Sequence, residues 1–359
     1  MSDVAFWGPG DDPALRPFRD ALQAEWERRG YQFVHGADPN AACVFNFVDP
    51  QDPKPFRRRQ RSTYVVAVHT RPDRPDDVLR FEYPMLVRAL ANLAMLVVPG
   101  DACYFVTPEQ GFYSVPDPGD PAEWARALFE RIEPLATSRL VIDNQFDADL
   151  EPDLWGGDEQ TAALFRAGQR LDALGLLPAP FPLEEIVGPD DLRWIKLVYG
   201  IGGLSYGNLS ARKDERRFWM SASGVDKSNL REIGRDILLV KGYDAESAKM
   251  LLSVPPGVEP RRASVDAIEH WMIYQEHPEV GAIVHVHAWI PGVEATEFNY
   301  PCGTAELATA VAEIIRRAPD PGRTVVGLKN HGLTITGPNL DDIFARIEPV
   351  IETQIPMTA

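Results

Sequence analysis

Two histidines stand at alternate positions of an apolar run, Ile283-Val-His-Val-His-Ala-Trp289. The run predicts a β-strand, and alternate side chains of a strand point to one face. The imidazoles of His285 and His287 would then start about 6.5 to 7 Å apart on the same face. At that separation both rings can bind one metal ion through nitrogen atoms at about 2.0–2.1 Å. The alternative is a pair of core histidines satisfied by hydrogen bonds, so the rest of the chain must decide.

Length, composition and charge indicate how many domains the chain forms and which partners are disfavoured. The chain has 359 residues, of which 45% are hydrophobic, so it can form two ordinary cores and we expect two domains. A net charge of -17 argues against a nucleic-acid partner. The run 57–61 carries four arginines, which we interpret as a solvated face rather than an anion site.

Cysteine usage and hydropathy indicate the compartment. The three cysteines lie far apart and form no CxxC pair, which disfavours both a disulfide framework and a thiolate zinc site. No run approaches 18 apolar residues, and the first residues lack the pattern of a signal peptide. We therefore expect a cytoplasmic protein that does not bind membranes.

Residues 1–143 alternate apolar runs with amphipathic ones. This alternation is typical of a parallel sheet covered by helices. We therefore predict a Rossmann-like or flavodoxin-like α/β domain of unknown role. The turn Gly8-Pro-Gly10 follows the first strand but lacks the third glycine and the spacing of a dinucleotide fingerprint, which favours a plain turn. The acidic stretch 144–158 is loop-like and predicts a linker, with the second domain at 159–359.

Short polar motifs follow one another in the second half, after a helix expected at about 159–174. Each has an ordinary explanation when taken alone. Asn208 or Ser223 could form a turn, and Ser264 could cap a helix whose dipole Asp266 stabilises. The motifs are Gly207-Asn-Leu-Ser-Ala-Arg212, Ser221-Ala-Ser-Gly224, Ser264-Val-Asp266, His285-Val-His287 and Lys329-Asn-His-Gly332.

In this order the motifs resemble those of the class II aldolase/adducin family, across about residues 159–350. Asp266 and His285 are 19 residues apart, the interval that the family uses between its acid and its first histidine. The resemblance implies a class II aldolase-like α/β/α domain in which His285, His287 and His331 bind a divalent metal. Zinc is expected first, with manganese, cobalt or iron as alternatives. The adducin branch keeps the fold without these histidines, so their presence favours an enzyme.

The resemblance also implies roles for the remaining motifs. Aldolases of the family have an acid/base glutamate at the position of Asp266, and ribulose-phosphate epimerases have an aspartate near the metal. Asp266 is therefore either a base or a fourth ligand. The residues that match a substrate phosphate cradle, and that we predict to bind substrate, are Ser205, Asn208, Ser223, Gly224 and Ser264.

Some features depart from the family pattern. Val265 stands where the phosphate binders have a second serine, so we expect a substrate without phosphate or with a weakly bound one. The loop after His287 is short, and we expect the family's C-terminal segment to be absent. The substrate-facing tyrosines of the family thus have no clear match, although Tyr300 lies in the shortened loop.

The expected function is that of a metal-dependent lyase, acting on a small hydroxy-carbonyl or sugar-like substrate of carbohydrate metabolism. Retro-aldol cleavage comes first and dehydration or epimerisation next, through a metal-stabilised enediolate. One alternative is an Fe(II)-dependent oxygenase or decarboxylase at the same site. Another is a non-catalytic binding or scaffold protein. Family members are usually oligomers with active sites between subunits, so we expect a homotetramer.

Overall fold

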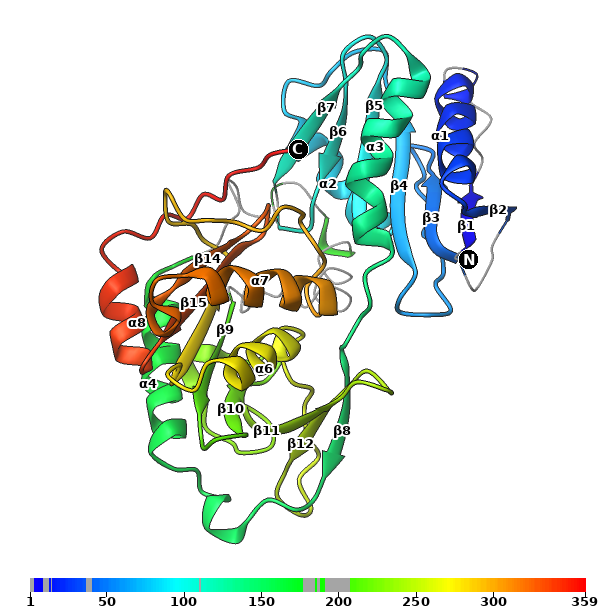
Figure 1. Ribbon diagram of the computed structural model, residues 1–359. Helices are drawn as coiled ribbons and strands as arrows, with labels where there is room; N and C mark the ends of the chain where they lie inside the picture. The colour runs from blue at the N-terminus through cyan, green and yellow to red at the C-terminus, as the bar shows by residue number, and fades with distance from the viewer. Residues whose placement is uncertain are drawn as a thin grey trace. The chain divides into compact units, whose positions relative to one another are not determined.

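The computed structural model describes residues 3–8, 13, 15–36, 41–109, 111–176, 185, 188–190 and 207–359. The chain forms two compact units, each built around its own sheet in a mixed α/β architecture (Figure 1). No helix among these described residues is long and apolar enough to cross a membrane. The first unit comprises Met1–Thr137, Ala179–Tyr199 and Met357–Ala359, and the second comprises Ser138–Pro178 and Gly200–Pro356.

The first unit contains a seven-stranded sheet in the order β2-β1-β3-β4-β5-β6-β7. Its core is formed by apolar side chains of the strands and of α1 and α3. The strands are β1 (Asp3–Trp7), β2 (Gln32–His35), β3 (Ala41–Phe47), β4 (Tyr64–Thr70), β5 (Leu93–Val98), β6 (Ala102–Val106) and β7 (Phe112–Pro116). The helices are α1 (Arg16–Arg28), α2 (Val78–Arg88) and α3 (Pro121–Ala136).

The parallel pairing predicted from the sequence is found in β1 to β5, and β6 and β7 depart from it by running antiparallel. Only residues 99–101 join β5 to β6, and a connection this short can form only a hairpin. At the end of β1, Gly8 has φ +98°, and a Cβ atom there would lie 2.1 Å from the Phe47 carbonyl oxygen. This close approach requires glycine. Pro9 and Gly10 of the same turn lie outside the described residues.

The second unit contains an eight-stranded sheet in the order β14-β15-β13-β9-β10-β11-β12-β8. Only β12 and β8 pair in parallel; the other neighbours are antiparallel. The strands are β8 (Asp143–Asp147), β9 (Gly207–Arg212), β10 (Phe218–Ser221), β11 (Ile237–Asp244), β12 (Lys249–Ser253), β13 (Ala282–Val286), β14 (Val325–Leu328) and β15 (Gly332–Gly337). The helices are α4 (Glu159–Ala173), α6 (Ala267–Glu276), α7 (Ala305–Arg317) and α8 (Leu340–Ile347).

Helices lie against both faces of this sheet (Figure 1). Helix α6 lies over the face that carries His285 and Ser210, because Tyr274 of α6 is hydrogen-bonded to Ser210. Helix α8 lies over the other face, where Ile343 packs against Gly337. The polar residues of the central strands are therefore enclosed between the sheet and α6.

The segment 144–158, expected as a linker, is partly sheet. Residues 144–147 belong to β8, which pairs in parallel with β12 at the edge of the second sheet. The helix expected at about 159–174 is present as α4. Residues 144–147 are mostly polar although they form a strand, because β8 lies at the edge of the sheet and is partly exposed to solvent.

Asp158 connects α4 to the sheet, so we expect its replacement to destabilise the fold. Its carboxylate caps α4 at the Thr161 amide and accepts hydrogen bonds at 2.8 Å from Lys213 Nζ and from the Trp219 indole. Asp158→Ala removes all three, and we expect it to lower the free energy of unfolding by about 2–4 kcal/mol. Denaturant titration measures this loss. Asp158→Asn, which can keep the cap, should lose less; an equal loss would show that the cap does not contribute.

Candidate metal and active site

Strand β13 holds His285 at the centre of the second sheet. Its Cα atom pairs with Asn208 of β9 on one side and Thr334 of β15 on the other. The side chain is 1% exposed, and its Nδ1 atom lies 3.0 Å from the Leu333 carbonyl oxygen. Because a carbonyl can only accept, Nδ1 carries the proton and Nε2 presents a free lone pair.

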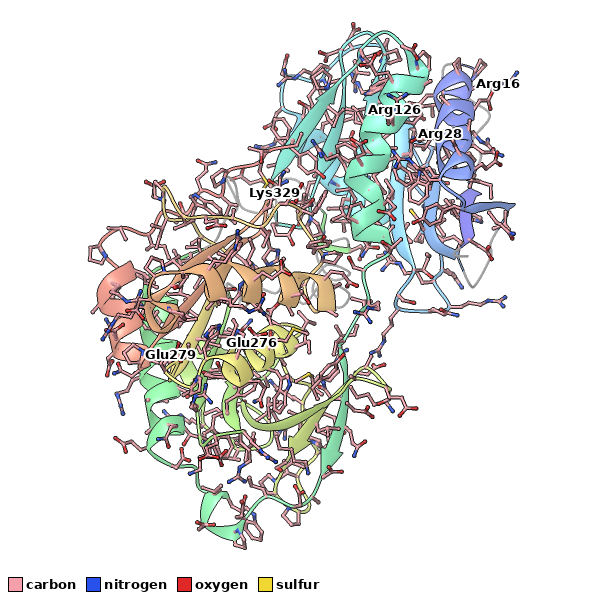
Figure 2. All side chains as sticks on the ribbon, viewed as in Figure 1. Arg16, Arg28, Arg126, Glu276, Glu279 and Lys329 are labelled. Carbon is pink, nitrogen blue, oxygen red and sulfur yellow. The ribbon has the colours of Figure 1, made fainter. Side chains whose placement is uncertain are left out.

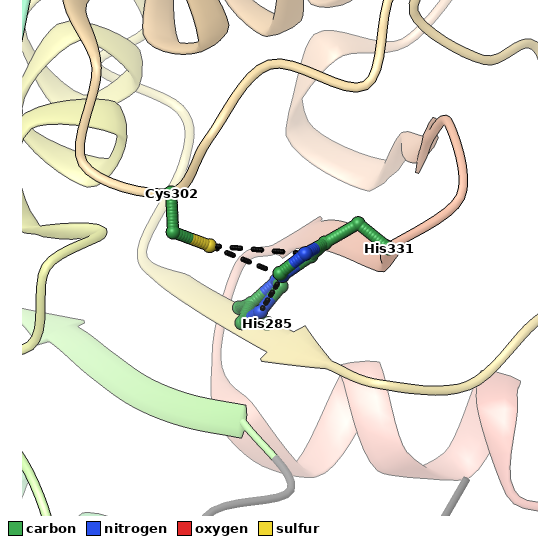
Figure 3. Close-up of side chains that lie close together, drawn as sticks. All are labelled: His285, Cys302 and His331. Carbon is green, nitrogen blue, oxygen red and sulfur yellow. Dashed lines mark hydrogen bonds between the residues drawn. The ribbon is translucent and has the colours of Figure 1, made fainter. Parts of the chain in front are cut away.

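His331 lies in the turn between β14 and β15. Its amide donates to the Leu328 carbonyl at 3.0 Å, and the preceding Asn330 adopts φ +56°, a conformation that asparagine tolerates. A Cβ atom at Gly332 would lie 2.2 Å from the Val286 carbonyl oxygen, so glycine allows this turn to approach β13. The result is a distance of 3.3 Å between the Nε2 atoms of His331 and His285 (Figure 3).

His287 follows the last residue of β13 and is half-buried. Its ring centroid is 5.1 Å from that of His285 and 4.8 Å from that of His331. The structure thus brings together the three histidines predicted from the sequence: His285 in β13, His287 just after it, and His331 in a turn more than forty residues later.

Cys302 is a site neighbour that the sequence analysis missed. Its Sγ atom lies 3.1 Å from His331 Nε2 (Figure 3). The potential ligand atoms of His285, Cys302 and His331 all lie within 4.8 Å of one another. The absence of a CxxC pair disfavours a thiolate zinc site built from neighbouring cysteines, but here the fold brings a single cysteine to the histidines. No local sequence signal identifies it.

Asp266 is the residue preceding α6, but its carboxylate does not cap that helix. Oδ2 accepts hydrogen bonds from Asn208 Nδ2 at 2.6 Å and Ser264 Oγ at 3.3 Å, and lies 4.0 Å from His285 Nε2. The side chain is buried, and its Oδ1 atom has no hydrogen-bond partner. The N-cap position of α6 is occupied by Asp266, so the alternative in which Ser264 caps this helix is wrong. Asp266, Asn208 and Ser264 instead form one hydrogen-bonded group beside the histidines.

Charge in this site follows from burial and proximity. Burial by itself would raise the pKa of Asp266, but His285, His331 and a hydrogen bond from Cys302 lower it to about 2. Burial lowers the pKa of His285 to about 4 and holds that of His287 well below its ordinary value. At neutral pH Asp266 is therefore ionised, and His285 and His287 are neutral, which is the form of histidine that binds metals.

The other predicted substrate-binding residues lie at the edge of this group. Ser223 and Gly224 are exposed, and their loop is tied to the segment before Asp266 by a hydrogen bond of 2.9 Å from the Ser223 amide to the Arg262 carbonyl. Ser205 lies outside the described residues. The structure therefore joins Asn208 and Ser264 directly to Asp266, and places Ser223 and Gly224 only nearby.

Arg212 and His270 lie near the site but have structural roles. Arg212 donates to the carbonyls of Tyr274, His277 and Val280, so its guanidinium fixes the end of α6. His270 is fully buried and its Nδ1 lies 2.8 Å from Ser210 Oγ, outside the histidine cluster.

Lys227 is a second residue that sequence reasoning did not place in the site. It is 1% exposed, and burial lowers its pKa to about 8, while Asp226 and Asp266 oppose that shift. A lysine in the sequence SGVDKSN gives no signal of burial, because lysine is normally a surface residue.

The donor set fits a divalent metal. Two nitrogen ligands at about 2.0–2.1 Å from a tetrahedral zinc ion are about 3.3–3.4 Å apart, and the Nε2 atoms of His285 and His331 are 3.3 Å apart. Oδ1 of Asp266 and Oδ1 of Asn208 are buried without hydrogen-bond partners, which is costly unless a ligand satisfies them. We therefore assign the histidine cluster as the part of the chain that could hold a metal.

Comparison with known proteins bears on the same region. Residues 195–290, which include Asp266, His285 and His287, match the family model described as the Class II Aldolase and Adducin N-terminal domain. These residues belong to the class II aldolase and adducin family. The resemblance inferred from the spacing of the motifs is thereby confirmed, and we refer to the second unit as the class II aldolase unit.

Individual relatives align with part of this unit. Methylthioribulose-1-phosphate dehydratase of Enterobacter sp. (strain 638) is 30% identical over 153 residues, which cover 43% of this chain and 63% of the relative. The protein of the same name from Serratia proteamaculans (strain 568) is 37% identical over 82 residues, 23% of this chain and 34% of the relative. The chain thus spans less than two thirds of the length of these curated relatives.

Among solved structures, L-fuculose-1-phosphate aldolase from Thermus thermophilus is similar, with 22% sequence identity and a TM-score of 0.32. The match covers 52% of this chain and 85% of that one.

Glu269 gives the class II aldolase unit a specific dependence of stability on pH. It is 1% exposed and accepts a hydrogen bond from Thr334, and burial, together with the Asp266 charge, raises its pKa from 4.5 to about 8. Glu269 is then protonated in the folded protein but ionised in the unfolded chain between these two values. Stability should therefore fall as pH rises from about 4.5 to about 8.

Glu269→Gln should reduce this slope, because glutamine is neutral at every pH. The measurement is the midpoint of denaturant unfolding at several pH values from 5 to 8. Glu276→Gln is the matched control on the same helix, since Glu276 lies at the surface in an ion pair with Arg316 (Figure 2). If all three proteins show the same slope, Glu269 does not titrate as inferred.

Proposed function

We propose that the class II aldolase unit is a metal-dependent lyase that acts on a small hydroxy-carbonyl compound. The observation that supports this most is the meeting of the three histidines with the buried carboxylate of Asp266, whose Oδ1 atom has no hydrogen-bond partner. His285, His287 and His331 would hold the metal, with zinc, cobalt or iron as the favoured ions. When bound there, the metal would polarise the carbonyl and hydroxyl oxygens of the substrate.

Asp266 is the residue that we propose to move the proton. Its low pKa keeps it ionised at neutral pH, and the hydrogen bonds from Asn208 and Ser264 fix Oδ2. Oδ1 is then the oxygen available to accept a proton from the carbon next to the substrate carbonyl. The same oxygen can return that proton to the hydroxyl group that leaves, so that the hydrogen and the hydroxyl depart together as water.

Dehydration is the lyase reaction that we favour. Retro-aldol cleavage was the first expectation from the motifs, and both reactions need a proton acceptor beside a polarised carbonyl. The curated relatives that match this unit are dehydratases of a phosphorylated keto sugar, which favours loss of water over cleavage of a carbon–carbon bond. Asn208, Ser223, Gly224 and Ser264 are proposed to bind the rest of the substrate, with Ser205 as a further candidate.

The experiment combines metal analysis with a lyase assay. Purified protein should contain about one divalent ion per chain, and hydroxy-ketones with a hydroxyl group two carbons from the carbonyl should lose water. Chelation should remove this activity and added zinc or cobalt should restore it. Metal-free protein without lyase activity would overturn the proposal, and oxygen uptake with substrate would assign the site to an Fe(II)-dependent oxygenase instead.

Val265 is expected to weaken binding of a phosphate group on the substrate. A Cβ atom at Gly303 would lie 3.1 Å from Val265 Cβ, so this valine packs beside the loop that carries Cys302 and offers no hydrogen bond. We expect Val265→Ser to increase affinity for a phosphorylated hydroxy-ketone by roughly ten- to a hundredfold, since a hydrogen bond to a charged group contributes about 1.5–3 kcal/mol.

Calorimetry on matched compounds with and without phosphate measures this change, and the unphosphorylated partner serves as the control. A wild-type protein that already prefers the phosphorylated compound a hundredfold, with no gain from serine, would contradict the prediction.

The remaining expectations are also proposals. The first unit is proposed to be Rossmann-like, and its role is not assigned. The whole protein is proposed to be a cytoplasmic homotetramer, which light scattering tests directly.

A further inference from the structure

The loop that carries Cys302 is fixed in place by its surroundings. The Val141 amide donates to the Gly303 carbonyl at 2.7 Å, and the Ala305 amide donates to the Arg139 carbonyl at 3.0 Å. Within the loop, Thr304 Oγ1 donates to the Pro301 carbonyl at 2.8 Å. Cys302 therefore sits on a restrained backbone, and its thiol is held at the histidines rather than free to swing through solvent.

The surroundings of the thiol are those of a ligand site. Cys302 Sγ is 3.1 Å from Nε2 and 3.9 Å from Nδ1 of His331 (Figure 3). The potential ligand atoms of Cys302, His285 and His331 all lie within 4.8 Å of one another. A zinc ion with sulfur at about 2.3 Å and nitrogen at about 2.0–2.1 Å would place these two ligand atoms about 3.6 Å apart, so binding needs Sγ and Nε2 of His331, now 3.1 Å apart, to separate by about half an ångström.

A second observation at the same place comes from Asp266, whose carboxylate is also a neighbour of the thiol. Asp266, which is 4% exposed, has an Oδ1 atom without a hydrogen-bond partner, and its other oxygen lies 4.0 Å from His285 Nε2. A buried carboxylate oxygen left unpaired beside imidazole nitrogens and a thiol is costly, and a bound cation would offset that cost.

We propose that Cys302 is a protein ligand of the metal, so that the site is a mixed centre of three imidazoles and one thiolate. This inference rests on the metal site proposed above. On binding, the S–H bond breaks, the proton passes to solvent, and a bond from sulfur to the metal forms without any change of oxidation state.

Two consequences follow for the class II aldolase unit. A thiolate selects zinc, cobalt or iron over magnesium and manganese, because the latter prefer oxygen ligands. With Cys302 in the fourth position, Asp266 is not needed as a ligand and remains available to accept a proton.

The test uses full-length protein loaded with Co(II), whose absorption reports a bound thiolate through a charge-transfer band in the near ultraviolet. Wild-type protein should show this band with about one ion per chain. Cys302→Ala should lose the band, keep Co(II) on the three histidines, and release it to a chelator about tenfold more readily or faster still. Cys103→Ala is the matched control, because Cys103 is a buried cysteine of the first unit and should leave the band unchanged.

X-ray absorption of zinc-loaded wild-type protein provides a check without any substitution, and one sulfur at about 2.3 Å is expected. Co(II) bound at one ion per chain without a thiolate band, or a band that survives in Cys302→Ala, would overturn the role of Cys302 and leave the histidine site standing. Failure of wild-type protein to bind Co(II) at all would overturn the metal site itself, and the cysteine proposal with it.

Discussion

Protein in which His285 and His287 are both replaced by alanine should bind no divalent metal. Both rings lie in the cluster, with centroids 5.1 Å apart, and only His331 and Cys302 would remain of the proposed donors. Structural zinc requires four ligands, and a pair of donors cannot compete with common chelators. We expect metal content to fall from about one ion per chain to the background of the measurement.

The fold should survive this double replacement. β13 is held by backbone ladders to β9 and β15, which alanine does not disturb, so the far-ultraviolet circular dichroism should stay close to that of the wild type. His277→Gln is a suitable control, because His277 lies at the end of α6 beside Glu279 and outside the cluster. Stoichiometric metal in the double variant would show that these histidines are not ligands.

Replacement of Asp266 by asparagine should reduce the lyase rate by about a hundred- to ten-thousandfold. Asparagine has the same shape, but it cannot accept the proton that Oδ1 is proposed to take. The measurement is turnover of the hydroxy-ketone that the wild type dehydrates, together with the metal content of each protein. We expect the variant to retain its metal.

A matched control and one contrary outcome make this experiment decisive. Asp214→Asn alters a carboxylate in a surface turn, where Asp214 pairs with Arg217, and should leave the rate unchanged. Loss of metal in step with loss of rate would assign Asp266 as a ligand instead. An unchanged rate would remove Asp266 from the chemistry.

The sequence by itself determined the parts of the site that lie on one local element. Alternation along a strand predicts that His285 and His287 share a face, because the side-chain period of a β-strand is two. His287 is the first residue after β13, and its ring centroid lies 5.1 Å from that of His285. The order and spacing of the later motifs identified the family, and the match over residues 195–290 confirms it. The parallel pairing of β1 to β5 followed from apolar runs separated by amphipathic stretches.

Tertiary structure decided everything that depends on pairing between distant segments. His331 reaches His285 because β15 pairs with β13, with Leu333 opposite Val286, and a register cannot be read from either strand alone. The Asp266 carboxylate accepts a hydrogen bond from Asn208 rather than capping α6, and Asn208 of β9 lies beside it only in the folded chain.

Cys302 shows the same limit most clearly. It stands alone in a loop after β13, without a second cysteine at ligand spacing, so local sequence gives no reason to place it near a metal. Its position is set by contacts of its loop with residues 139–141, more than 160 residues earlier in the chain. Such contacts form only when the sheet closes, and for that reason only the folded chain shows that the thiol and the histidines meet.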